Sequence, residues 1–235
     1  ADEFQYLHDR NSGGESFFLL ADDNFMLAHR GTEFCEAMDR PSLREGTRWF
    51  VQARADDIAK MEAVVPRLRR IGCWWILLGV EHNSASVLNE LGKKSSAETA
   101  KKAVRILNES DIFSQETFII GSRQETEKSV EALRRFVIDI NPALPIFMCL
   151  TPFPGTRTYQ EAERNGWIED HNWAHYDMVH AIMPTETLSR KELQEELYDC
   201  YRSFYGSWKR RLQGIFSRNE LRRKVYWYMT GRGIL

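Results

Sequence analysis

The stretch that most constrains the fold is Cys73–His82, which reads CWWILLGVEH. The residues from Trp74 to Gly79 carry no charge and do not alternate with polar residues. A short apolar run of this kind is typical of a strand buried on both faces, as in a parallel sheet covered by helices. Glu81 and His82 follow at the carboxyl end of the strand, where α/β proteins bind their ligands. The stretch therefore predicts an α/β fold with polar groups at a ligand-binding edge.

Further apolar runs recur along the chain, and patterns typical of helices separate them. The other predicted strands are 17–21, 49–53, 117–120 and 146–150. Helical patterns cover 58–70, where we expect Pro66 to kink or split the helix, and 126–140. Ser95 and Glu98 form a capping-box pattern at the start of another helix. This alternation predicts βα units, a parallel sheet and right-handed crossovers.

The pattern changes after Thr156. Residues 157–187 are irregular and rich in aromatic side chains. Ser189 and Glu192 then form a second capping-box pattern, which predicts the start of a long helix. We expect two parts, namely the βα part in 1–156 and a helical, basic extension in 157–235 that packs on it.

Charge and cysteine content exclude several other classes. The net charge of the 235 residues is −2, and the longest apolar run, Trp74–Val80, is too short to span a membrane. No signal-peptide pattern follows Ala1. The cysteines form no CxxC pair, which excludes a local zinc or iron–sulfur loop and favours buried free thiols; they are Cys35, Cys73, Cys149 and Cys200. We therefore expect a cytoplasmic protein without a transmembrane segment.

Polar groups or a glycine follow every predicted strand. They are Asp22 and Asp23, Arg54, Glu81 and His82, Gly121 with Glu125, and Thr151. Carboxylates and an arginine on one buried edge need partners, because an unpaired buried charge is costly. A zwitterionic ligand with an amino group, a carboxylate and ribose hydroxyls would satisfy both signs. For any one residue alone, the alternative is an ordinary helix cap or a surface ion pair.

Several of these stretches, taken in order, resemble one known family. The segments FLLADDNF, WFVQARAD, ILLGVEHNSASVLNELGKKS, FIIGSRQET and LTPFPGT resemble the later strands of the radical S-adenosylmethionine (SAM) barrel, in the branch with an N-terminal cobalamin-binding domain. The tail, YD…MPTETLSRKEL…YRSFY, is similar to that of the anaerobic magnesium-protoporphyrin IX monomethyl ester cyclase group. The resemblance implies the C-terminal part of a partial (βα)6 TIM-like barrel with five parallel strands, plus a helical C-terminal extension.

The resemblance also implies roles for the strand-end residues. Asp22 and Asp23 stand where the family meets the amino group of the methionine moiety of SAM. Arg54 stands where the family contacts its carboxylate or the ribose, and Glu81 where the family contacts the ribose or the methionine moiety.

A further element of the family, GxIxGxxE-like, matches FIIGSRQET. It implies that the backbone at Gly121 lies along the adenine and that Glu125 belongs to the same cofactor-binding element. A glycine suits such a close approach of backbone to a flat ring. The residues 122–124 depart from the turn that the family usually has here.

The CxxxCxxC loop of the family, which follows its first strand, is absent from this sequence. Reductive cleavage of SAM requires the [4Fe–4S] cluster that those thiolates hold. We therefore expect no metal ligands or catalytic residues here, and expect the cluster and cobalamin in a longer parent chain. A C-terminal piece of such an enzyme is the simplest interpretation; a split subunit and a degenerate homologue are the alternatives.

The implied function is that of a radical SAM oxidoreductase, in which this portion binds SAM and shields a 5′-deoxyadenosyl radical. The specific expectation is oxidative cyclisation of magnesium-protoporphyrin IX monomethyl ester, with a tetrapyrrole as substrate and an electron donor protein as partner. The alternatives are a cobalamin-dependent methyltransferase and a non-catalytic binding subunit or nucleic-acid-binding module.

The remaining polar and aromatic residues favour structural interpretations. His171 and His175 have the spacing of metal ligands on a helix but no evident third ligand, so we expect no metal there. We expect His82 on the cofactor rim, and we expect the aromatic residues of 167–178 to pack the extension onto the barrel rather than to line a substrate pocket.

Nine Lys and Arg residues lie between 201 and 235 against one acid, Glu220. We favour an amphipathic tail that docks on the protein over a nucleic-acid or membrane surface.

Overall fold

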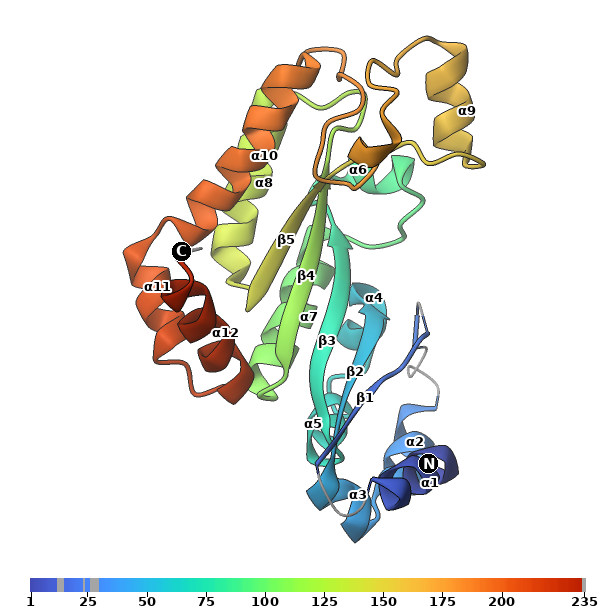
Figure 1. The fold of residues 1–235 in the computed structure, drawn as a ribbon, viewed down its shortest axis with the longest axis vertical. Coiled ribbons are helices and arrows are strands. Elements are labelled where there is room, and N and C mark those ends of the chain that lie inside the picture. Colours follow the sequence, from blue (N-terminus) through green and yellow to red (C-terminus); the bar gives the residue numbers. More distant parts are fainter. Residues whose placement is uncertain (12–14, 23, 26–29, 234–235) are drawn as a thin grey trace.

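The computed structural model describes residues 1–11, 15–22, 24–25 and 30–233. Five parallel strands form one sheet in the order β1-β2-β3-β4-β5, and with their helices they make a half-barrel (Figure 1). The strands are β1 (Ser16–Leu19), β2 (Thr47–Arg54), β3 (Cys73–Glu81), β4 (Phe113–Ile120) and β5 (Leu144–Cys149). Each strand pairs with the next one along the chain, as crossover βα units require. The predicted partial barrel is confirmed.

Helices follow or precede every strand. The first six are α1 (Asp2–Arg10), α2 (Gly31–Met38), α3 (Pro41–Gly46), α4 (Ala55–Lys60), α5 (Val65–Arg70) and α6 (Ala85–Glu90). The others are α7 (Ala97–Glu109), α8 (Glu127–Ile140), α9 (Arg157–Arg164), the short η1 (Trp173–His175), α10 (Arg190–Tyr205), α11 (Trp208–Ile215) and α12 (Glu220–Gly231). Within the described ranges, no helix combines the length and apolarity that a membrane crossing requires.

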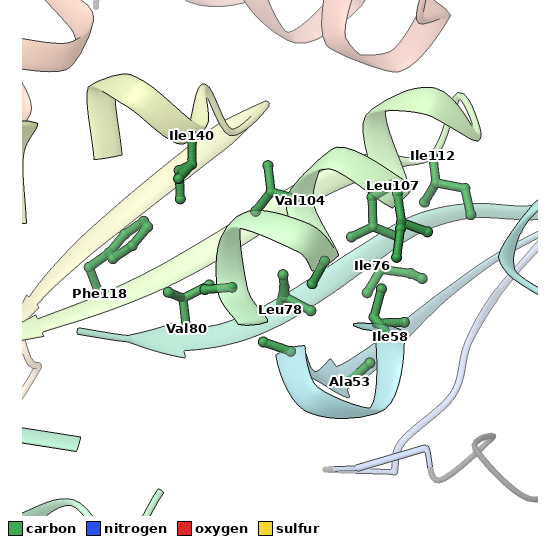
Figure 2. Close-up of a cluster of buried hydrophobic side chains, with 14 of the residues drawn as sticks. Ala53, Ile58, Ile76, Leu78, Val80, Val104, Leu107, Ile112, Phe118 and Ile140 are labelled. Atoms are coloured by element: carbon green, nitrogen blue, oxygen red, sulfur yellow. The ribbon is translucent and has the colours of Figure 1, made fainter. Parts of the chain in front are cut away.

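The core lies between the outer face of the sheet and its helices. Ile76, Leu78 and Val80 of β3 are buried and point toward Val104 and Leu107 of α7 (Figure 2). Each such side chain contributes roughly 1.5–3 kcal/mol when it leaves water. This packing fixes the position of β3 and therefore the position of Glu81 and His82 at its carboxyl end.

The inner face of the sheet is only half-buried. Trp75, Leu77 and Gly79 alternate with the buried residues of β3, and Thr117 of β4 and Ile146 of β5 are half-buried like them. The prediction that β3 is buried on both faces is therefore wrong for one face, because this face lines the hollow of a half-barrel.

Local signals in the sequence predicted some element boundaries correctly and one incorrectly. The helix pattern with Pro66 in its interior does split, into α4 and α5. Ser189 and Glu192 form the predicted capping box of α10. The Ser95 capping box is wrong by one residue, because the Ser96 side chain accepts the hydrogen bond from the Thr99 N–H and caps α7.

The two C-terminal helices contact the body of the chain. Arg210 of α11 donates hydrogen bonds to Asn141 Oδ1 (2.9 Å) and to the Ile138 carbonyl (2.8 Å), at the carboxyl end of α8. A cation suits this position because the last carbonyls of a helix carry partial negative charge. All four cysteines are free and buried, as predicted.

β4 carries a buried carboxyl group. Glu116 of β4 is fully buried, and among the described residues neither of its carboxylate oxygens has a hydrogen-bond partner. Burial raises the pKa of Glu116 from 4.5 to about 7, and the positive charge of Arg222 on α12 offsets part of this effect. The folded chain therefore holds a proton here that the unfolded chain releases at lower pH.

The raised pKa of Glu116 predicts a loss of stability with rising pH. Between about pH 4.5 and 7 the folded state binds more protons than the unfolded state, so the free energy of unfolding should fall across this window by about 3 kcal/mol and then level off. We expect Glu116→Gln to remove this dependence. Urea unfolding between pH 5 and 8 tests it, with Glu131→Gln on the surface of α8 as the control; equal slopes in both variants would contradict the prediction.

Candidate functional site

Residues of opposite charge lie side by side at the carboxyl ends of β2 and β3. Arg54 of β2 pairs in register with Gly79 of β3, and Gly79 pairs in turn with Thr117 of β4. The Glu81 carboxylate folds back over Gly79: a Cβ added there would lie 2.8 Å from Glu81 Oε1. The structure thus brings two of the predicted site residues, Arg54 and Glu81, together on the inner face.

Glu81 continues the inner-face series of Leu77 and Gly79, at an irregular end of β3. The register between β3 and β4 shifts between Gly79 and Glu81, and Glu81 has φ 67°, in the left-handed region that non-glycine residues rarely adopt. Lys93 Nζ lies 2.8 Å from Glu81 Oε1, and Thr117 Oγ1 lies 3.5 Å from Oε2. The ion pair with Lys93 is the main contact that holds this buried carboxylate, since Thr117 stands at the limit of hydrogen-bond distance.

The guanidinium group of Arg54 uses only part of its hydrogen-bonding capacity within the protein. Its Nε donates to Asp56 Oδ1 at 3.0 Å, and its side chain is 36% exposed. Burial would raise the pKa of Asp56, but hydrogen bonds and charge from Arg54 and Lys60 outweigh it, so the pKa is lowered. Arg54 therefore faces an ionised carboxylate on one side and retains further N–H groups for a ligand.

Asp22, which follows β1, has a local hydrogen-bond partner of its own. Asp22 is exposed, and its Oδ1 accepts a hydrogen bond from the Asn24 N–H at 3.0 Å. No hydrogen bond or ion pair among the described residues joins it to Arg54 or Glu81. Asp23, which the sequence analysis placed beside it, lies outside the described residues.

Glu125 lies at the centre of a buried network below the strand ends. Its Oε2 accepts hydrogen bonds from the N–H groups of Gly121 (2.6 Å) and Ser122 (3.0 Å), and its Oε1 lies 3.0 Å from His82 Nε2. The Ser84 N–H donates to His82 Nδ1, so Nε2 carries the proton that binds Glu125. Both Glu125 and His82 are 1% exposed.

The network therefore joins the ends of β3 and β4 to the start of α8, and protein donors use both oxygens of Glu125. His82 is buried within it and both of its ring nitrogens contact protein groups, while its expected place on the cofactor rim stays a prediction. Gly121 has φ 98°, which only glycine adopts easily, and both neighbouring N–H groups are turned toward Glu125. Glu125 thus positions the Gly121 backbone.

The segment between α9 and α10 adds groups that the sequence analysis did not single out. A cavity of about 610 Å³ lies beside it, and Arg123 stacks over Trp167 at 4.3 Å in its wall. His180 Nδ1 lies within hydrogen-bond distance of Asp177 Oδ2, where only the three-residue spacing was available as a signal. His171 and His175 form no metal site: in the part of the chain that the structure describes, no three His, Cys, Asp or Glu side chains could hold an ion.

Comparison with known proteins agrees with this architecture. Residues 1–137 match the model of the radical SAM superfamily. The anaerobic magnesium-protoporphyrin IX monomethyl ester cyclase of Cereibacter sphaeroides is 31% identical over 196 residues, which is 83% of this chain and 32% of that protein. Bacteriochlorophyllide d C-12(1)-methyltransferase of Chlorobaculum tepidum is 27% identical over 216 residues, which is 91% of this chain and 46% of that protein.

Among solved structures, the radical SAM methyltransferase TsrM from Kitasatospora setae, with cobalamin and a [4Fe–4S] cluster bound, has a TM-score of 0.60 at 18% identity. The similarity covers 83% of this chain and 39% of TsrM, and shows a shared fold. The family match over more than half of the chain identifies the class: this chain belongs to the radical SAM superfamily. It spans less than half the length of the curated relatives.

The two glutamates should differ in their effect on stability. Glu125→Ala leaves the His82 N–H and two backbone N–H groups buried without a partner, so we expect a loss of about 3–5 kcal/mol. Glu81→Gln removes one contact with a half-exposed lysine, so we expect a loss of about 1 kcal/mol or less. Urea unfolding of both variants measures the difference, and equal losses would show that Glu125 is not the structural centre of the network.

Proposed function

We propose that this chain is the SAM-binding portion of a longer radical SAM enzyme. The observation that carries the proposal is the pair of opposite charges, Arg54 and Glu81, on the inner face at the carboxyl ends of the strands. A zwitterionic ligand can satisfy both, since Arg54 would bind its carboxylate and Glu81 its amino group or ribose hydroxyls. When bound, SAM supplies the radical chemistry of the superfamily.

The other residues of the site would orient this ligand. The Gly121 backbone, held by Glu125, offers a surface without a side chain for the adenine. Asp22, at the end of β1, and its neighbour Asp23 would contact the amino group. Lys93 would balance the Glu81 charge before SAM arrives.

The cysteines of this chain do not fit an iron–sulfur cluster. They are buried and lie on four different elements, α2, β3, β5 and α10, and the described residues contain no metal-binding group. Ligands for a [4Fe–4S] cluster must therefore come from other polypeptide, as must a cobalamin-binding domain and an electron donor protein. On this basis the chain alone would not cleave SAM.

For the substrate, we propose a tetrapyrrole, and specifically oxidative cyclisation of magnesium-protoporphyrin IX monomethyl ester. The relative at 31% identity, whose name states this activity, supports the proposal. Methyl transfer to a tetrapyrrole is the second candidate, supported by the bacteriochlorophyllide methyltransferase. A nucleic-acid-binding role is disfavoured, because the basic tail uses Arg210 and Arg222 within the protein.

The SAM site predicts a loss of affinity in two variants. In the full-length protein with its cluster reconstituted, we expect Arg54→Ala and Glu81→Gln each to weaken SAM binding by roughly tenfold or more, as the loss of a charged hydrogen bond implies. Equilibrium dialysis measures the dissociation constant. Arg135→Ala and Glu131→Gln, on the exposed side of α8, are the matched controls. Unchanged affinity in both site variants would overturn the assignment.

A further inference from the structure

The segment 173–180 lies at the carboxyl end of the sheet. The Cys149 N–H, at the last residue of β5, donates to the Met178 carbonyl at 2.8 Å. Figure 1 shows this segment, between α9 and α10, running past the end of β5. It therefore stands on the same edge of the half-barrel as Arg54 and Glu81.

His180 in this segment presents one free ring nitrogen. Its Nδ1 lies 2.8 Å from Asp177 Oδ2, and Asp177 Oδ1 accepts the N–H groups of Val179 (2.8 Å) and His180 (2.9 Å), which fix the carboxylate. Because Nδ1 donates to the carboxylate, Nε2 carries the lone pair. Nε2 has no hydrogen-bond partner among the described residues, and the side chain is 46% exposed.

His175 resembles His180, but both of its ring nitrogens have hydrogen-bond partners. Its Nδ1 lies 2.9 Å from Asp170 Oδ2, and its Nε2 lies 3.3 Å from Asn172 Nδ2, which can donate to it. The two imidazole rings stack with centroids 4.5 Å apart and planes 21° apart. His175 therefore supports the ring of His180, and only His180 has an open lone pair.

A histidine whose second nitrogen donates to a carboxylate has the form of a metal ligand, because the carboxylate fixes the tautomer and raises the basicity of the other nitrogen. The described residues contain no third ligand that could complete a protein-built metal site. A metal bound here must bring its own ligands. Among the exposed residues of this segment, Trp173 (62%), Met178 (41%) and Val179 (46%) are apolar and stand beside the polar Asn172 and Asp177, so the carrier of the metal should present a large apolar face.

We propose that His180 Nε2 is the axial ligand of the metal ion at the centre of a tetrapyrrole substrate. This inference rests on the proposed function and specifies how the substrate is held. A macrocycle supplies four equatorial nitrogens and leaves an axial position open, which a single imidazole fills. The same chemistry is available to the cobalt of cobalamin, but a corrin is ringed by amide side chains that need polar partners. The exposed side chains of Trp173, Met178 and Val179 suit the apolar face of a metalloporphyrin.

The test compares metallated and metal-free porphyrin on the full-length protein. We expect magnesium-protoporphyrin IX monomethyl ester to bind about tenfold more tightly than the metal-free ester, with a shift of its Soret band. His180→Ala should abolish both the preference and the shift, and should leave the affinity for the metal-free ester within about twofold. His171→Ala, at an exposed histidine just before the segment, is the matched control and should keep the preference for magnesium.

A second variant separates a lost ligand from a disturbed loop. In His180→Gly, added imidazole should restore the Soret shift, which a merely structural role of His180 would not allow. If both esters bind equally well to the wild type and to His180→Ala, His180 is not an axial ligand, and the proposal of a tetrapyrrole substrate is unaffected. If neither ester binds, the proposed tetrapyrrole substrate is wrong as well. An effect of His180→Ala confined to the spectrum of bound cobalamin would overturn the assignment to the substrate.

Discussion

The carboxylate of Glu125 is the contact on which the edge of the sheet depends. It binds His82 from the end of β3 and two backbone N–H groups from the end of β4, while the Thr187 hydroxyl donates to its backbone carbonyl. Three segments that are distant in sequence meet at this one residue. Parallel strands have no hairpin to align their ends, so a buried polar network of this kind determines where loops leave the sheet.

Much of the fold could be predicted because its signals are local. The apolar run of β3, the proline inside the pattern of 58–70 and the Ser189 capping box each specify structure within a few residues. The start of β4 could not be predicted, since Ser114 and Glu116 look like loop residues yet lie buried in a central strand. Packing by distant helices overrides local propensity there.

The candidate site was predicted in part. Strand alternation places Glu81 on the same face as Gly79, but the sequence does not predict the register that sets Arg54 beside Gly79. A shift of one residue reverses the side of the sheet to which a side chain points. His180 was missed for a related reason: its free nitrogen is defined by the turn that brings Asp177 against the ring, and a single spacing does not encode that turn.

The contact of the Glu81 carboxylate with Gly79 has a consequence for how variation in this site should be interpreted. Any side chain at 79 would displace the carboxylate, because the space that a Cβ needs is already filled. The two positions are therefore constrained as one unit, and a mutational scan would score Gly79 as functional although it offers no group to a ligand. A side chain at 79 would be accommodated either by a shift of the flexible Glu81 carboxylate or by a shorter residue at 81.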